Sequence, residues 1–75
     1  MTVRFASLND VKEFVGLATL QPFNVQVQDG SHTVNAKSFM EMFTLEFSSP
    51  LRVDVDGTEN EVHFSQVARK FLAEA

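Results

Sequence analysis

The sequence predicts an α+β fold, an open-faced sandwich in which helices cover one face of a small sheet. Two observations lead to this prediction. Some segments alternate apolar and polar residues with the period of two typical of strands with one buried face, and others space apolar residues by three and four, as amphipathic helices do. In chain order they run strand, helix, strand, strand, helix, strand, helix. The apolar face of each strand needs helices to cover it.

Length and composition predict one domain that depends on packing alone. The 75 residues, taken as a single domain 1–75, lie near the lower limit for a core without cross-links. Hydrophobic residues make up 44% of the chain and include eight phenylalanines, which is enough for such a core. The chain has no cysteine, so neither a disulfide nor a thiolate metal site contributes to stability.

The first elements are a short strand and a helix. Val3 and Phe5 alternate with polar neighbours, which indicates a strand with one buried side. The helix is expected from residue 10 to about residue 20, because apolar residues recur there at helical spacing, and Pro22 limits its continuation. The residues able to cap its start are Ser7, Asn9 and Asp10.

A hairpin and a second, short helix are expected next. Segments 25–28 and 32–35 alternate valine with polar residues, and the turn formers Asp29-Gly30-Ser31 separate them. The helix is expected from Ser38 to about residue 45, before Ser48-Ser49-Pro50 breaks the chain.

The last elements are a strand and what we expect to be the longest helix. Leu51–Val55 alternates cleanly as a strand and is closed by Asp56-Gly57. After it, apolar residues follow at i, i+3, i+4, i+7 and i+8, the spacing of an amphipathic helix. They are Phe64, Val67, Ala68, Phe71 and Leu72.

Ser38 begins the pattern Ser-x-x-Glu with Glu41, which is typical of a capping box. In such a box the serine hydroxyl accepts a hydrogen bond from the backbone N–H three residues on. The glutamate carboxylate reaches back to the serine N–H. The pattern therefore predicts that Ser38 is the N-cap of the second helix.

The segment Val34-Asn35-Ala36-Lys37-Ser38-Phe39-Met40 resembles the region of the regulatory serine in the HPr family, the histidine-containing phosphocarrier proteins of the bacterial sugar phosphotransferase system. The resemblance extends over most of the chain, because Phe14-Val15, the Gly30 turn, Leu51 to Val55 and the amphipathic end follow in the family's order. It implies a four-stranded antiparallel sheet with three helices on one face.

The motif that carries phosphate in HPr is missing. In that family a Gly-Leu-His-Ala-Arg-Pro-like motif follows the first strand, and its histidine accepts the phosphoryl group. Aligned on Phe14-Val15, this chain has Ser7 in place of the histidine, in a shorter loop. Asn9 replaces the arginine and Asp10 the proline. The resemblance therefore implies a divergent member that does not carry phosphate on histidine.

The remaining candidates for a phosphoryl acceptor are His32, His63 and Ser7. A phosphocarrier needs a nitrogen nucleophile, but neither histidine matches the family's position, so we expect both to be surface residues. A serine phosphate ester is too stable to relay phosphate onward. We expect Ser7 to cap the first helix, because Asp10 already puts a carboxylate in the first turn.

Ser38 is the candidate for regulatory phosphorylation. In Gram-positive relatives of HPr the matching serine is phosphorylated by HPr kinase, and the modified protein binds a transcription regulator of catabolite repression, so the resemblance implies these two proteins as partners. A phosphate would add about two negative charges at a helix N-terminus, where they are favourable. The alternative is that Ser38 serves only as a cap.

The second helix also carries a candidate partner-binding surface. Its apolar residues outnumber those that one short helix can bury on one side. The resemblance implies that Met40 and Phe43 belong to an exposed patch that docks partner proteins, with Lys37 beside it. Glu41 and Glu46 stand where relatives carry glycine, so a partner would meet additional charge. The alternative is that these apolar residues fill the core.

Several functional classes are not expected. The net charge is −4 and the six basic residues are scattered, which disfavours direct nucleic-acid binding. No apolar run approaches the ~20 residues that cross a bilayer, and no signal-peptide pattern is present, so we expect a cytoplasmic protein. The sequence predicts no enzyme, cofactor or metal site, because it contains no nucleophile–base pair, phosphate loop or ligand spacing.

Three functions remain open. The first is a regulatory or protein-binding module of the HPr family, in sugar transport regulation and catabolite repression, that does not transfer phosphate. The second is a phosphocarrier that uses a non-standard residue. The third is a vestigial HPr-fold domain kept for interaction. The sequence favours the first.

Overall fold

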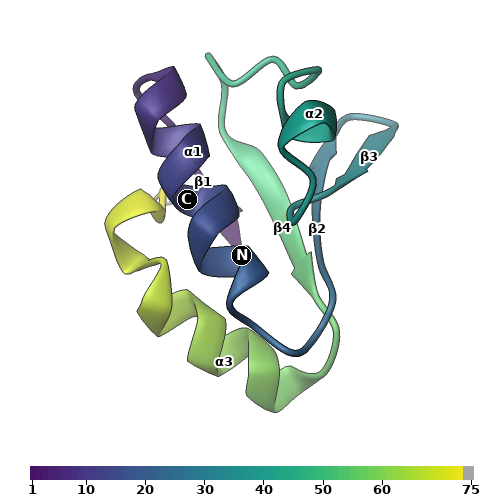
Figure 1. Ribbon diagram of the computed structural model, residues 1–75, viewed down its shortest axis with the longest axis vertical. Coiled ribbons are helices and arrows are strands. Elements are labelled where there is room, and N and C mark those ends of the chain that lie inside the picture. The colour runs from purple at the N-terminus through teal and green to yellow at the C-terminus, as the bar shows by residue number, and fades with distance from the viewer. Residues whose placement is uncertain (74–75) are drawn as a thin grey trace.

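The computed structural model describes residues 1–73 and has the predicted α+β architecture (Figure 1). Helices lie over one face of a single four-stranded sheet. The strands are β1 (Thr2–Val3), β2 (Val25–Asp29), β3 (His32–Asn35) and β4 (Leu51–Val55). The helices are α1 (Leu8–Thr19), α2 (Phe39–Met42), α3 (Thr58–Val67) and a 3-10 turn, η1 (Arg69–Phe71).

The sheet is antiparallel throughout, in the order β1-β4-β2-β3. Val27 in β2 pairs with Val34 in β3 and with Val53 in β4, which makes a row of valines on the face toward the helices. Because side chains alternate along a strand, the neighbouring Gln26 and Gln28 lie on the opposite, polar face. The predicted open-faced sandwich is confirmed.

The core lies between the valine row and the helices, and aromatic rings fill its centre. The ring of Phe14 in α1 packs edge to face against Phe5, Phe64 and Phe71, with centroids 5.1, 5.6 and 6.0 Å away. Phe14 and Phe64 are fully buried. Edge-to-face geometry is favourable for such pairs, so the rings join the segment just after β1 with α1, α3 and η1 in one core.

Three elements begin or end away from their predicted bounds. The first strand ends at Val3, and Phe5 is buried beyond it. The helix expected from residue 10 begins at Leu8, since Ser7 caps it. The helix expected to reach about residue 45 ends at Met42 and continues in tighter turns.

The prediction that the last helix is the longest is wrong. α3 has 10 residues and α1 has 12. At Ala68 the backbone leaves helical geometry, and the following residues pair with β1: Arg4 N–H donates to Phe71 O (2.8 Å) and Ala73 N–H to Thr2 O (2.9 Å). The change of direction buries Phe71 but leaves Leu72 at the surface.

Two glycines permit the turns that follow β2 and β4. The hairpin closes through Gly30-Ser31 between the paired residues Asp29 and His32, and Gly30 has φ +61°. Gly57, with φ +95°, is the N-cap of α3. Both conformations lie in the region that favours glycine, which accounts for the turn signals in the sequence.

Candidate functional site

The N-terminus of α1 is closed by its own side chains. Ser7, the N-cap, accepts a hydrogen bond from Asp10 N–H at its Oγ (3.4 Å). The Asp10 carboxylate accepts from Ala6 N–H through Oδ2 (2.8 Å). Both residues take the roles of capping groups, and the carboxylate already supplies the negative charge that this helix end favours. The prediction that Ser7 caps the first helix is confirmed.

A shallow groove of about 450 Å³ lies beside this helix start. Its lining includes the basic side chains of Arg4 and Lys70 and the acidic side chain of Asp10. Lys70 Nζ bonds the carboxylate of Glu13 at 2.5 Å, and its ammonium lies 5.3 Å from the ring centroid of Phe71. Charges of both signs meet in the groove, so it has no strong preference for an anion.

The two histidines lie on different elements. His32 Nε2 is 3.0 Å from Thr44 Oγ1, and that hydroxyl donates its hydrogen to Glu41 O at 2.6 Å. The His32 ring therefore donates to Thr44, which assigns the hydrogen to Nε2. His63 is an exposed residue of α3 and makes no side-chain hydrogen bond within residues 1–73.

Ser38 is the N-cap of α2, as predicted, but the predicted capping box is only half formed. Ser38 Oγ accepts from Glu41 N–H at 3.3 Å. The Glu41 carboxylate does not return to Ser38; it accepts from Asn35 N–H at 3.2 Å. Ser38 N–H donates instead to Asn35 O at 3.0 Å. Asn35 is the last residue of the edge strand β3, and its backbone N–H donates to the Glu41 carboxylate.

Lys37 anchors the turn before α2. Its Nζ donates to Gln21 O at 2.8 Å, in the segment that follows α1, and its backbone N–H donates to Asn35 Oδ1 at 2.9 Å. The side chain is half-buried. Its ammonium therefore holds two segments of the fold together, a role that the sequence alone did not indicate.

The apolar residues around α2 divide between the core and the surface. Met42 and Leu45 are buried, and Phe39 and Phe47 are half-buried. Met40 is 79% exposed and Phe43 is 47% exposed. We call Met40, Phe43 and Glu46 the α2 surface. Both interpretations of this segment apply, to different residues: some side chains fill the core, whereas Met40 and Phe43 do not.

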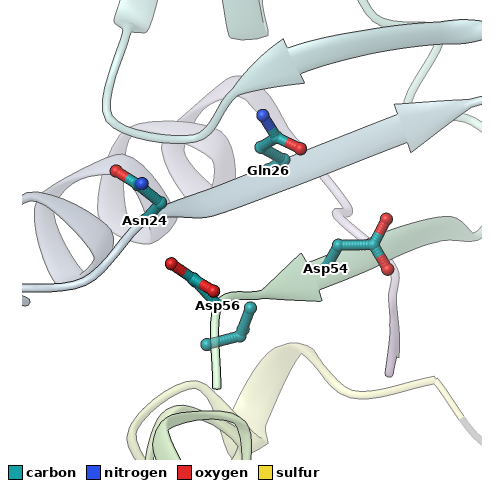
Figure 2. A pocket seen from close by; sticks show the side chains of 5 residues that line it. Asn24, Gln26, Asp54 and Asp56 are labelled. Atoms are coloured by element: carbon teal, nitrogen blue, oxygen red, sulfur yellow. The ribbon is translucent and has the colours of Figure 1, made fainter. Parts of the chain in front are cut away.

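A second hollow, of about 250 Å³, opens between the ends of β2 and β4. Figure 2 shows the labelled side chains of Asn24, Gln26, Asp54 and Asp56 around it. Gln26 and Asp54 are cross-strand partners in the register of β2 and β4. Within residues 1–73 no group of three or more His, Cys, Asp or Glu residues is arranged to hold a metal. Alternation along the strands had put Gln26 and Asp54 on the polar face without indicating a hollow.

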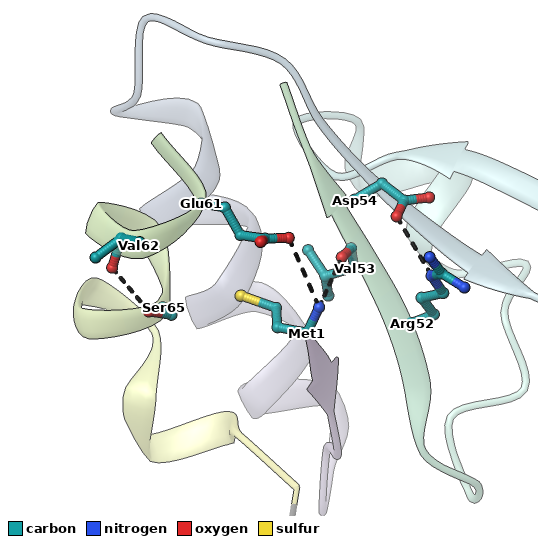
Figure 3. Close-up of polar contacts among 7 residues, drawn as sticks. All are labelled: Met1, Arg52, Val53, Asp54, Glu61, Val62 and Ser65. Atoms are coloured by element: carbon teal, nitrogen blue, oxygen red, sulfur yellow. Dashed lines mark hydrogen bonds and ion pairs between the residues drawn. The ribbon is translucent and has the colours of Figure 1, made fainter. Parts of the chain in front are cut away.

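Ion pairs engage part of the acidic surface near β4 (Figure 3). Arg52 Nε lies 3.4 Å from Asp54 Oδ1 on the polar face. The amino group of Met1 lies 3.3 Å from Val53 O and 3.9 Å from Glu61 Oε2, which links β1, β4 and α3. The Met1 contacts fasten β1 and β4 to α3, whereas the Arg52–Asp54 pair lies within β4.

The backbone is similar to that of a solved phosphocarrier protein. A crystal structure of the phosphocarrier protein HPr from Bacillus anthracis str. Ames superimposes with a TM-score of 0.77 over 96% of this chain and 94% of that one. The two sequences are 20% identical. This protein has an HPr-like fold. The similarity confirms the architecture that the sequence resemblance implied.

Comparisons of sequence give no match. No protein-family model matches the chain, and no curated protein matches it either. Among residues 1–73, no helix has the length and apolar character needed to cross a membrane.

Proposed function

We propose that this protein is a protein-binding module with an HPr-like fold that does not carry phosphate on histidine. The observation that carries the proposal is the state of the α1 N-terminus. Ser7 stands where the resemblance expects the phosphoryl-accepting histidine, and it serves there as a helix cap. Such a module belongs to the bacterial cytoplasm and acts by binding rather than by catalysis.

The chemistry around Ser7 supports the loss of phosphotransfer. The Asp10 carboxylate lies in the first turn of α1 and accepts from Ala6 N–H, just before the N-cap, so this helix end already holds a negative charge. A second anion there would meet repulsion from Asp10. Asn9 provides no positive charge in place of the family's arginine. The groove beside α1 does contain Arg4, but Asp10 lines the same groove.

The α2 surface supports a binding role. Met40 and Phe43 are large apolar side chains on the outside of a small protein. Exposed apolar groups of this size are typical of interaction sites when they cluster, and methionine adapts to varied partners. The rings of Phe39 and Phe43 lie 4.4 Å apart, so Phe43 is held by a half-buried neighbour.

Phosphorylation of Ser38 is the proposed switch. The hydroxyl accepts from Glu41 N–H, and Glu41 directs its carboxylate to Asn35 N–H. A phosphate with about two negative charges would lie close to that carboxylate, so it would change the electrostatics of α2 beside Met40. The partners implied by the resemblance are HPr kinase and a transcription regulator of catabolite repression.

Intact mass spectrometry tests the proposal. The protein is incubated separately with phosphoenolpyruvate plus enzyme I and with ATP plus HPr kinase, with a normal HPr as positive control and Ser38→Ala as the matched variant. We expect no phosphate from enzyme I and one from the kinase that Ser38→Ala abolishes. An acid-labile phosphate from enzyme I would overturn the proposal. No addition in the kinase reaction would remove the switch and leave the binding module.

A further inference from the structure

The three residues of the α2 surface form one ridge. After α2 the backbone continues with bonds from Thr44 N–H to Glu41 O (3.0 Å) and from Leu45 N–H to Met42 O (3.2 Å), each spanning three residues. In such turns side chains three apart lie on the same side. Met40 and Phe43 are accordingly both exposed, whereas Met42 and Leu45 are buried; Glu46 follows these turns directly and is exposed too.

Three carboxylates lie in the segments next to the apolar part of this ridge. Glu46 ends it, and Glu41 follows Met40 directly. Asp29 reaches the same end from the hairpin, because its Oδ2 accepts from Glu46 N–H at 3.3 Å. Within residues 1–73 the ion pairs join Met1 with Glu61, Arg52 with Asp54 and Lys70 with Glu13. None of them neutralises a carboxylate beside the ridge.

Basic groups near the ridge are few and engaged. Lys37 bonds a neutral backbone carbonyl and keeps its positive charge, and His32 contacts Thr44 from the side of β3. Three carboxylates, those of Glu41, Glu46 and Asp29, outnumber this one ammonium. The ridge is therefore an apolar strip of Met40 and Phe43 with an excess of negative charge. The whole chain has a net charge of −4, so its long-range field has the same sign.

We propose that the α2 surface binds a segment of another protein that presents apolar side chains flanked by lysine or arginine. The proposal rests on the binding role proposed above and adds the chemistry of the partner. The apolar side chains of the partner cover Met40 and Phe43, and its cations face Glu41, Glu46 and Asp29. Charge complementarity of this kind selects partners and speeds association.

The same charges argue against other occupants. A second copy of this chain would bring its own carboxylates against those of the first, which is repulsive. Anionic membrane surfaces and nucleic acids would meet the same repulsion. A partner with an acidic rim would have to bury like charges, which costs affinity and is a recognised means of excluding wrong partners.

Nuclear magnetic resonance titration of the nitrogen-15-labelled protein provides the test. The probe is a short amphipathic helical peptide of leucine and lysine, and the control peptide has glutamate in place of lysine. We expect the lysine peptide to shift the amide signals of residues 39–46, and the glutamate peptide to leave them unchanged. Met40→Ala should raise the Kd about tenfold, the effect of truncating a central contact.

Charge variants separate a specific site from general attraction to an acidic protein. Glu46→Lys should raise the Kd about fivefold, as expected for reversing an exposed charge beside the contact. Glu59→Lys makes the same change of net charge in α3, far from α2 in Figure 1, and Val62→Ala removes an apolar group that is 56% exposed there. Salt screens charges at that distance, so both variants should bind like the unmodified protein.

Several outcomes would overturn the proposal. Equal weakening by Glu59→Lys and Glu46→Lys would mean that only net charge matters. Binding of the glutamate peptide would show that the charged side chains of the partner are acidic and not basic. Shifts at residues 39–46 that depend on protein concentration, or on anionic vesicles of phosphatidylserine, would identify a self-association face or a membrane face instead. A phosphate from enzyme I would overturn the proposed function without changing these titrations, so the two failures are distinguishable.

Discussion

The eight phenylalanines of this chain divide into two groups with different environments. One group lies in the core or packs directly against it, with ring centroids 5.1 to 6.3 Å apart in edge-to-face pairs. Its members are Phe5, Phe14, Phe23, Phe64 and Phe71. The other group is Phe39, Phe43 and Phe47, in and after α2. The rings of Phe39 and Phe43 are tilted against each other, and Phe43 is 47% exposed.

The two groups differ in how many elements their packing joins. The core group comes from both ends of the chain, from α1 and from the segment before β2, so its packing joins distant elements. The α2 group is local, and the short helix has one inward side, which Met42 and Leu45 already occupy. Phe43 is left outside and is free to contact a partner.

Replacement of one ring from each group should give the largest contrast. Phe64→Ala removes a fully buried ring that packs against Phe14 and Phe23, and we expect a loss of about 3–5 kcal/mol in the free energy of unfolding. Phe43→Ala should change it by no more than about 0.5 kcal/mol, as is usual at a surface. Denaturant titration measures both. Similar losses for the two variants would contradict the division into groups.

Much of the core was predictable because apolar residues at helix or strand spacing lie on one face of their element, and that face is buried. Phe64, Ala68 and Phe71 were expected on one face of the last segment, and all three are buried. Leu72 was expected there too but is 39% exposed. The spacing of residues does not show that the edge of β1 is available for pairing, and pairing of Leu72 with Val3 ends the helical pattern. Tertiary contact overrides local spacing at this point.

A second comparison sets the stability of α2, which depends on its N-cap, against the stability of the core elements. Ser38→Ala removes the acceptor of Glu41 N–H, and loss of an N-cap costs about 0.5–2 kcal/mol. Because α2 lies outside the aromatic core, amide exchange should accelerate in residues 38–43 more than in β2 or α1. Ser49→Ala, in the exposed turn before β4, is the matched control. Unchanged exchange at Glu41 N–H would rule out the cap.

The candidate site was only partly predictable. Ser38 as a cap and Met40 and Phe43 as surface residues follow from local pattern and resemblance, and the structure agrees. The bond from Asn35 N–H to Glu41 was missed, because that amide is available only where β3 is an edge strand. Strand order is a tertiary property. The bond from Lys37 to Gln21 O was missed because it too depends on how distant segments pack together.

The link between β3 and α2 can be tested at Glu41. Glu41→Ala removes the acceptor of Asn35 N–H, so exchange of that amide should become faster while the core amides stay protected. Glu41→Gln keeps an oxygen acceptor and should retain most of the protection. Glu59→Ala, on the exposed side of α3, controls for loss of a carboxylate. Equal exchange in Glu41→Ala and the unmodified protein would contradict the contact.

The smallest expected effect is the acid titration of Glu46, at the end of the α2 surface. Hydrogen bonds from Ser48, from its side chain and from its backbone N–H (3.2 Å), hold the pKa of Glu46 below its usual range. Because the pKa of Glu46 is lower in the folded state than in the unfolded state, its hydrogen bonds stabilise the fold at pH values above the unfolded-state pKa. This stabilisation is lost as the pH falls through the folded-state pKa. Ser48→Ala should raise the pKa toward its usual value, measured by carboxyl carbon-13 resonances. An unchanged pKa would mean that the Ser48 side chain does not stabilise the ionised carboxylate of Glu46.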